Sequence, residues 1–225
     1  MEEERYEREP FIEGFARFRE HTGERVLEVG IGAGTDFTNL VRSGALATGV
    51  DLTEESLKLV ERRLELEGLH ADLRCADAER LPFPDESFDF VYSWGVIHHT
   101  PNVRAAAAEI VRVTRPGGRV CVMVYNRHSL VAAQAWLVNG LLRGRPLRTL
   151  DDVIRSHIES PGTQAFTESE ARELFPGLDP MTITPVVTPY DVRLTRSRFA
   201  SRWVQQLVPS RLSWFLVVEG TKALH

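Results

Sequence analysis

The stretch that decides the fold reads Arg25-Val26-Leu27-Glu28-Val29-Gly30-Ile31-Gly32-Ala33-Gly34. Its first half is a short run rich in branched apolar residues, which predicts a buried strand. Its second half has glycine at every other position. Glycines directly after a strand let the backbone turn sharply and let a ligand come close, because there is no Cβ to clash. A dinucleotide site begins in the same way, so the glycines alone do not name the ligand.

Two details of this turn separate the possible ligands. The spacing is G-x-G-x-G, whereas a dinucleotide fingerprint has G-x-G-x-x-G. Glu28 stands two residues before the first glycine, near the strand end. A carboxylate there disfavours a pyrophosphate and suits a ligand that carries an ammonium and a sulfonium.

The sequence on both sides of this turn alternates short apolar runs with helical patterns. Such alternation predicts crossover connections and a mostly parallel sheet with helices on both faces, a Rossmann-like α/β fold. The expected strands are 25–29, 46–50, 71–75, 88–93, 119–125, 181–188 and 212–219, and the expected helices are 36–43, 54–67, 102–113, 130–142, 167–174 and 197–207. Ligands of such sheets bind outside the carboxyl ends of the strands.

Acidic residues follow three successive strands at those ends. Glu28 ends the first strand, Asp51 follows the second, and Asp77 follows the third. A carboxylate at Asp51 can accept hydrogen bonds from two ribose hydroxyls, and one at Asp77 can accept from an adenine amino group. Three acids at three strand ends therefore predict a site that binds adenosine and tolerates positive charge.

Several sequence motifs in order resemble one family. They are VLEVGIGAGT at 26–35, LPFPDESFDFVYS at 81–93, His98-His99 before a Thr-Pro helix start, and EIVRVTRPGGRV at 109–120. Together they resemble class I S-adenosylmethionine-dependent methyltransferases, in particular the ubiquinone- and menaquinone-biosynthesis (type 11) group. The resemblance covers residues 24–125, and Thr114 stands where the family more often has leucine.

The resemblance implies the cofactor, S-adenosylmethionine, which leaves as S-adenosylhomocysteine, and a seven-stranded sheet. It also implies which residues hold the cofactor. Gly30, Gly32 and Gly34 line its methionine part, with Glu28 beside them; Asp51 and Leu52 hold the ribose; Asp77 and Ala78 frame the adenine; and Ser93 and Trp94 border the sulfonium.

Two histidines are the candidate catalytic residues. Methyl transfer from a sulfonium is an in-line displacement, so a base is needed only if the acceptor must lose a proton. His98 or His99 can supply that base, because a neutral imidazole is available near pH 7. The alternative is that they only pack or cap before Thr100. Catechol-type methyltransferases carry a metal-binding acid after the fourth strand, where this chain has Trp94-Gly95-Val96, so we expect no metal.

We expect one domain over residues 1–225. Its parts are an N-terminal helical lid (1–23), a cofactor-binding core (24–125), an acceptor-side insertion (126–180) and C-terminal strands that complete the sheet (181–220).

The acceptor pocket is expected outside the family motifs. Tyr6, Phe11, Phe15 and Phe18 recur at roughly helical spacing, and their aromatic face either covers the acceptor or fills a satellite core. Tyr125 and Arg127 are expected to reach the acceptor after the fifth strand.

Composition limits the partners. The chain has 225 residues, a net charge of −5 and two cysteines, Cys75 and Cys121. The charge does not favour nucleic acid, and the acidic start and two thiols, expected to be reduced and buried, favour the cytoplasm. No apolar run reaches the ~20 residues that span a bilayer. Residues 130–142 fit a packed helix better than one lying on a membrane surface. The partner is expected to be a small-molecule acceptor, and the state a monomer or homodimer.

Three other functions fit parts of the sequence. A short-chain nicotinamide oxidoreductase would have Tyr-x-x-x-Lys, which no tyrosine here supplies. A non-catalytic binding module would keep the cofactor pocket without turnover. A protein or nucleic-acid methyltransferase would find its best support in Arg193, Arg196, Arg198 and Arg202.

Overall fold

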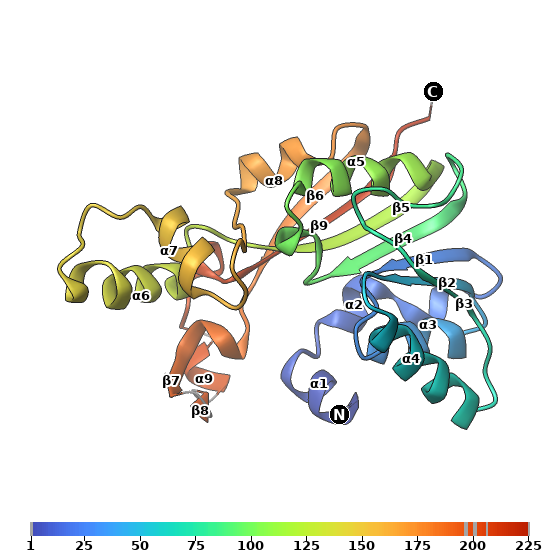
Figure 1. Ribbon diagram of the computed structural model, residues 1–225, viewed down its shortest axis with the longest axis horizontal. Coiled ribbons are helices and arrows are strands. Elements are labelled where there is room, and N and C mark those ends of the chain that lie inside the picture. The colour runs from blue at the N-terminus through green and yellow to red at the C-terminus, as the bar shows by residue number, and fades with distance from the viewer. Residues whose placement is uncertain (1, 196–197, 200–201, 206, 225) are drawn as a thin grey trace.

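A single seven-stranded sheet organises the chain (Figure 1). The structure is a computed structural model that describes residues 2–195, 198–199, 202–205 and 207–224. Its strand order is β3-β2-β1-β4-β5-β9-β6. The bounds are β1 (Arg25–Val29), β2 (Leu46–Asp51), β3 (Asp72–Cys75), β4 (Phe88–Trp94), β5 (Thr114–Tyr125), β6 (Leu178–Val186) and β9 (Phe215–Lys222). A short pair, β7 (Arg193–Thr195) and β8 (Arg198–Phe199), lies apart from the sheet.

The strands from β3 to β5 are parallel, and β9 runs antiparallel between β5 and β6. The strand order reverses between β1 and β4, which places the carboxyl ends of both strands at the crevice where open α/β sheets bind ligands. Strand β6 is an edge strand, which allows Pro185 to lie in it without breaking an inner ladder. This confirms the Rossmann-like fold and its mostly parallel sheet.

Helices cover both faces of the sheet, as Figure 1 shows. They are α1 (Glu2–Arg8), α2 (Ile12–Ala16), α3 (Thr35–Arg42), α4 (Glu54–Leu66), α5 (Val103–Val113), α6 (Leu130–Asn139), α7 (Leu150–His157), α8 (Glu168–Leu174) and α9 (Arg202–Gln205). Single 3-10 turns are η1 (Phe18–Glu20), η2 (Ile97–His99), η3 (Leu141–Arg143), η4 (Pro189–Val192) and η5 (Ser210–Leu212).

Alternation along the central strands divides the core into two layers. In β5, Val120, Val122 and Val124 pack with α5 and α8, whereas Cys121 and Met123 face the side of α2 and η1. This period of two is what a strand buried on both faces requires. A third cluster joins α3 and α4 beneath the glycine turn. Because Leu40 of α3 packs with Ile12 and Phe18, helices α3 and α4 and the N-terminal segment share one face of the sheet.

The structure corrects several expected boundaries. Strand β5 begins at Thr114, so Pro116-Gly117-Gly118 lies within it at a register shift against β4. The helix of residues 130–142 ends at Asn139. In place of one helix over 197–207 the structure has β8 and α9, and residues 196–197, 200–201 and 206, Arg196 among them, lie outside the described residues. Cys75 is exposed because β3 is an edge strand, whereas Cys121 is buried as expected.

Two segments outside the family motifs flank the carboxyl ends of β4 and β5. The N-terminal segment supplies α1, α2 and η1, and residues 126–175 supply α6 and α7, which project from the body of the molecule (Figure 1). No helix formed by the described residues is both long enough and apolar enough to cross a membrane.

Candidate functional site

The glycine turn after β1 packs closely against its neighbours at two glycines and faces open space at the third. Gly30, Gly32 and Gly34 have positive φ angles of 82°, 50° and 71°. A Cβ on Gly30 would lie 2.3 Å from Val96 Cγ2, and one on Gly34 would lie 2.5 Å from Val60 Cγ2. A Cβ on Gly32 would meet no described atom within 4 Å, so Gly32 faces open space. The turn thus needs glycine for packing at two positions and presents its backbone at the third.

Glu28 carries an unsatisfied carboxylate oxygen at this turn. Its side chain is 4% exposed, and Oε2 has no hydrogen-bond partner among the described residues. Burial, followed by the nearby Asp36 carboxylate, raises the pKa of Glu28 well above its ordinary value, while Arg5 opposes the shift. A buried orphan oxygen next to a bare backbone turn fits a ligand that brings a positive hydrogen-bond donor.

Asp36, at the start of α3, is held by the N-terminal segment. Arg5 donates to it from Nε at 3.1 Å and from Nη2 at 2.8 Å, a two-pronged ion pair. The Tyr6 hydroxyl donates to Oδ1 at 2.8 Å and the Tyr92 hydroxyl to Oδ2 at 3.0 Å. Of the two neighbouring buried acids, Asp36 therefore accepts hydrogen bonds at both of its oxygens, whereas Glu28 Oε2 accepts none from the described residues.

The acids after β2 and β3 reach the same edge of the sheet. Asp51 Oδ2 accepts from the Gly32 amide at 3.0 Å, and Oδ1 accepts from the Thr53 amide and hydroxyl, which orders the start of α4. Leu52 beside it is 71% exposed. Asp77 is exposed, and its Oδ1 accepts from the Glu79 amide, while Ala78 is half-buried. These side chains lie at the carboxyl ends of β2 and β3, and their ribose and adenine roles stay predictions.

Ser93 and Trp94 end β4 differently. Ser93 is fully buried and its hydroxyl donates to the Val29 carbonyl at 3.0 Å, which ties β4 to β1. Trp94 lines a cavity beyond the strand end, and its indole Nε1 is buried with no partner among the described residues. Ser93 thus supports the strand end, and Trp94 forms a wall.

That cavity has a volume of about 500 Å³ and lies between the ends of β4 and β5, α1, α6 and the loop after α7. Nine aromatic or apolar residues line it: Trp94, Met123, Tyr125, Val131, Ala135, Ile158, Tyr190, Trp214 and Phe215. Its charged and polar side chains are Arg5, Glu9, Gln134, His157 and Glu159. A cavity of this size with mixed walls fits a small molecule that has both an apolar body and a polar group.

The two candidate histidines have different surroundings. His98 is fully buried between Tyr125 and His99, and in the described part of the chain neither of its ring nitrogens has a hydrogen-bond partner. Burial, and then His99, lowers the pKa of His98 well below its ordinary value. His99 is only partly buried, and its Nε2 lies 3.2 Å from Glu159 Oε2. Neither histidine is among the residues that line the cavity, but the Glu159 partner of His99 is, and a catalytic role for either histidine stays a prediction.

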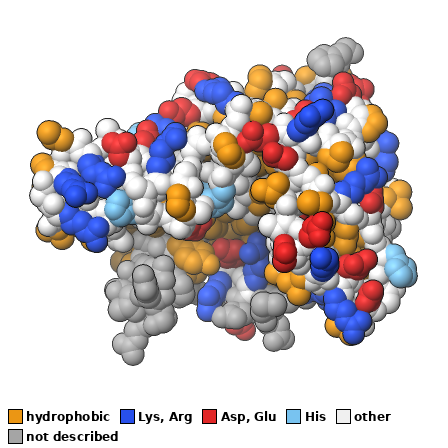
Figure 2. Space-filling model, in the orientation of Figure 1, with side chains coloured by type: hydrophobic (Ala, Val, Ile, Leu, Met, Phe, Trp, Pro, Cys, Tyr) orange, Lys and Arg blue, Asp and Glu red, His pale blue; other side chains and the backbone are white. Residues whose placement is uncertain are grey.

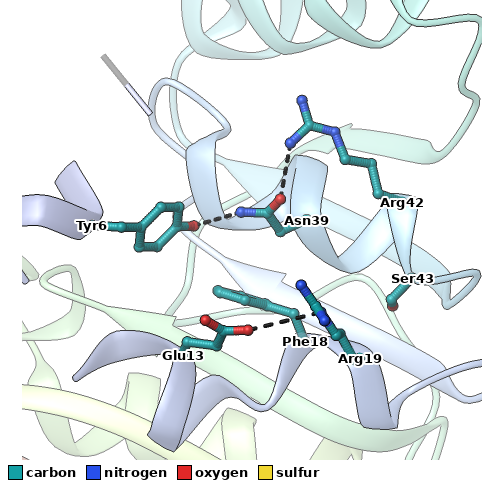
Figure 3. Close-up of a pocket in the computed structure, with 7 residues that line it drawn as sticks. All are labelled: Tyr6, Glu13, Phe18, Arg19, Asn39, Arg42 and Ser43. Atoms are coloured by element: carbon teal, nitrogen blue, oxygen red, sulfur yellow. Dashed lines mark hydrogen bonds and ion pairs between the residues drawn. The ribbon is translucent and has the colours of Figure 1, made fainter. Parts of the chain in front are cut away.

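Of the four residues expected to contact the acceptor, three do not line this cavity. Tyr125 lines the cavity, but Tyr6 lines a separate hollow of about 390 Å³ beside α3, where its hydroxyl accepts from Asn39 (Figure 3). Phe11 lies behind the cavity wall, with its ring centroid 6.1 Å from that of Trp94. Arg127 pairs with Asp151 at 2.7 Å and Glu170 at 2.9 Å. Tyr6 and Arg127 therefore hold the chain together at these positions.

Glu159 is one of several cavity residues that the sequence did not predict. It follows α7 in a loop with no motif, and its Oε2 accepts from the Tyr125 hydroxyl at 2.7 Å. Its partners lie 34 and 60 positions away in the sequence, so no local pattern marks it.

Comparisons with known proteins agree with this geometry. A family model described as a methyltransferase domain matches residues 27–122. The ubiquinone biosynthesis O-methyltransferase of Rhizobium leguminosarum bv. trifolii is 32% identical over 171 residues, which cover 72% of this chain and 68% of that protein. The chain belongs to the class I S-adenosylmethionine-dependent methyltransferases. This methyltransferase is thus a member of the family that its glycine turn and strand-end acids resemble.

The methyltransferase is also 41% identical over 133 residues to a phthiotriol/phenolphthiotriol dimycocerosates methyltransferase of Mycobacterium ulcerans, which covers 58% of this chain. It spans less than half the length of that relative (47%). Its fold is shared with a Haemonchus contortus phosphoethanolamine N-methyltransferase solved with phosphomonomethylethanolamine and S-adenosylhomocysteine. That match has a TM-score of 0.69 at 17% identity, and covers 96% of this chain and 52% of the other.

Proposed function

We propose that the protein transfers a methyl group from S-adenosylmethionine to a small, largely apolar acceptor. The observation that carries this proposal is the junction at the end of β4. A bare glycine turn with the orphan Glu28 carboxylate lies on one side of it, and a cavity walled by Trp94 and Tyr125 lies on the other. The names of the relatives, which act in ubiquinone biosynthesis and on phthiotriol dimycocerosates, support a lipid-like acceptor.

The residues at the strand ends have separate roles in this proposal. When bound, S-adenosylmethionine supplies an already activated methyl group on its sulfonium. Glu28 accepts from the ammonium of the methionine part and favours positive charge there. Asp51 accepts from the ribose hydroxyls, and Asp77 with Ala78 holds the adenine edge. The protein then contributes mainly proximity and alignment, which are worth roughly 7–11 kcal/mol.

The acceptor side is built from the segments outside the family motifs, and the chain acts as one domain. Segment 1–23 and segment 126–180 contribute Arg5, Glu9 and the α6 and α7 side chains to the cavity wall. Trp94-Gly95-Val96 supplies no carboxylate after β4, so we propose a metal-independent transfer. His99, and not His98, supports the acid–base chemistry, because only His99 has a polar contact, 3.2 Å from its Nε2 to Glu159 Oε2, with a residue that lines the cavity.

The partner is a small molecule and not nucleic acid, consistent with the net charge of −5. Free thiols at Cys75 and Cys121 support a reducing, cytoplasmic location, with the protein as a monomer or homodimer. Basic side chains gather at the left end of the molecule in Figure 2, the end at which α6 projects. Leu137, Leu141 and Leu142 are exposed there. Residues 130–142 therefore either face solvent or contact a membrane surface. Sedimentation with phosphatidylglycerol vesicles tests the second alternative.

Two measurements on the purified chain test the function. Titration calorimetry should show S-adenosylhomocysteine binding with one site per chain, and a screen of hydroxyl, amine and carbon acceptors should release S-adenosylhomocysteine with at least one class. Binding without turnover for any acceptor would favour the non-catalytic module. Absence of binding would rule out the cofactor assignment.

A further inference from the structure

Glu159 occupies an unusual position at the cavity. It is a non-glycine residue with φ of 52°, a left-handed backbone conformation that side chains disfavour. Its side chain is half exposed to the cavity, and one oxygen, Oε2, accepts both the Tyr125 hydroxyl at 2.7 Å and His99 Nε2 at 3.2 Å. The loop thus directs a carboxylate into the cavity and fixes its orientation from two sides.

His99 is itself oriented by the loop that follows Glu159. Its Nδ1 lies 3.0 Å from both Thr163 Oγ1 and Ser160 Oγ. With Nδ1 fixed, Nε2 is left facing the carboxylate. These hydrogen bonds outweigh the effect of burial and lower the pKa of Glu159, so this carboxylate is ionised near neutral pH. A carboxylate, an imidazole and two hydroxyls form a base with an orienting partner.

The charges in the cavity select the kind of acceptor group. Glu9 and Glu159 both line it, and they repel a carboxylate or phosphate. Arg5, which could attract one, donates two hydrogen bonds to Asp36 and lies 3.7 Å from Glu9. The aromatic walls of Trp94 and Trp214 favour an apolar or aromatic body. A neutral hydroxyl on such a body matches both features.

We propose that Glu159, held between Tyr125 and His99, accepts the proton of an acceptor hydroxyl as that oxygen takes the methyl group. The inference rests on the proposed function and names its catalytic base and its substrate class. The acceptor oxygen forms a bond to the methyl carbon, and the carbon–sulfur bond breaks with its electron pair going to sulfur. The hydroxyl proton passes to Glu159, and the Glu159–His99 pair stores it until it is released to solvent.

The test uses 4-hexylphenol as the probe and 4-hexylanisole, which lacks the proton, as its matched control. Glu159→Gln should lower turnover of 4-hexylphenol by about 10²- to 10⁴-fold, the usual contribution of a general base. It should weaken binding of the phenol more than binding of the anisole, and S-adenosylhomocysteine affinity should stay within about twofold, because Glu159 lines the acceptor cavity and not the glycine turn.

Glu86→Gln is the control variant, since Glu86 is also a left-handed glutamate, with φ of 58°, and lies outside the cavity. It should leave turnover unchanged. If Glu159→Gln does not fold, as judged by its melting temperature, Glu159→Asp replaces it and should lose at least tenfold in turnover. For His99 as a positioning residue, His99→Gln, which keeps a donor to Glu159, should retain more turnover than His99→Ala.

Four results would overturn the proposal. One is wild-type turnover in Glu159→Gln, and a second is wild-type protein that binds neither probe. A third is methylation of 4-hexylaniline without methylation of the phenol. The fourth concerns His98, His99 and Glu159, whose potential ligand atoms lie within 4.8 Å of one another. Loss of wild-type turnover in EDTA and its return with Zn²⁺ or Mg²⁺ would make this cluster a metal site. Failure of S-adenosylhomocysteine to bind the wild type would instead count against the proposed function.

Discussion

At Glu28 a buried carboxylate lies beside a second one, Asp36, and only Asp36 has its hydrogen-bond donors. The raised pKa of Glu28 means that the folded protein holds a proton there more tightly than the unfolded chain does. The stability from this proton is complete below the ordinary pKa and is lost as the pH rises through the raised value. We therefore expect Glu28→Gln to melt higher than the wild type at pH 8, with the difference shrinking toward pH 5.

The same substitution, Glu28→Gln, should weaken binding of the cofactor. Loss of one charge-assisted hydrogen bond costs about 1.5–3 kcal/mol, or about 10- to 150-fold in affinity for S-adenosylmethionine. Calorimetry in two buffers of different ionisation enthalpy should show proton release on binding to the wild type and none in the variant. A variant that loses thermal stability but keeps its affinity would make Glu28 a structural residue.

Asp51 combines a structural and a proposed binding role, and the two can be separated. Asp51→Ala should weaken binding of S-adenosylhomocysteine by at least about 10-fold, because a carboxylate that accepts hydrogen bonds from the ribose hydroxyls is lost. Thr53→Ala removes the helix cap of α4 and a donor to Asp51 but no expected ribose contact. It should cost about 0.5–2 kcal/mol of stability and leave the affinity unchanged. Equal affinities for Asp51→Ala and wild type would remove the ribose assignment.

The side chains that could be predicted from sequence are those fixed by position at a strand end. Glu28, Asp51 and Asp77 lie where the strand pattern placed them, because the register of a parallel sheet brings its carboxyl ends together. His98, Arg127 and Glu159 could not be predicted in this way. Their surroundings come from residues far along the chain, as with Tyr125 and Glu159, and a histidine pair looks the same in sequence whether it is buried or exposed.

At the scale of elements, the N-terminal segment has two parts with different roles. The helical spacing of its aromatic residues predicts a single helical face over both. Ile12, Ala16 and Phe18, from α2 and η1, are core residues, whereas Arg5 of α1 and Glu9, the residue after α1, contribute to the cavity wall. The turn between α1 and α2 breaks the helical spacing of the aromatic side chains. Deleting residues 1–18 would therefore remove hydrophobic-core residues together with residues that line the cavity. A point substitution in α1 tests the second group without disturbing the first.

Arg5→Met should destabilise the protein through the buried Asp36. The Asp36 side chain is 4% exposed and that of Arg5 is 32% exposed, so removing the cation leaves a mostly buried carboxylate with neutral donors only. The cost should lie at the low end of roughly 3–5 kcal/mol, measured by urea unfolding. Asp36→Asn added to Arg5→Met should recover much of this loss, since the buried Asp36 charge is then removed as well. If the double variant is no more stable than Arg5→Met, the loss of stability comes from the packing of α1 and not from the unpaired Asp36 charge.

For the whole molecule, the family motifs occupy one half of the chain and the acceptor cavity draws on both ends. Residues 5, 94, 125, 159 and 215 meet at that cavity, and such long-range assembly explains why no local sequence motif predicts which residues line it. The family model matches residues 27–122, and of the residues that line the cavity only Trp94 and Gly95 lie within that range.

Cofactor binding should therefore stabilise the whole fold, because the site joins β1, β2, β3 and β4 at the centre of the sheet. A ligand present at 100 times its dissociation constant adds about 2.7 kcal/mol when it binds only the folded state. For a chain of this length each kcal/mol raises the melting temperature by about 2–4 °C, so S-adenosylhomocysteine should raise it by roughly 5–11 °C. NAD, whose pyrophosphate would meet Glu28, should give no shift, and adenosine, which lacks the ammonium, should give a smaller one. A shift with NAD that equals or exceeds the shift with S-adenosylhomocysteine would mean that the glycine turn binds a pyrophosphate after all.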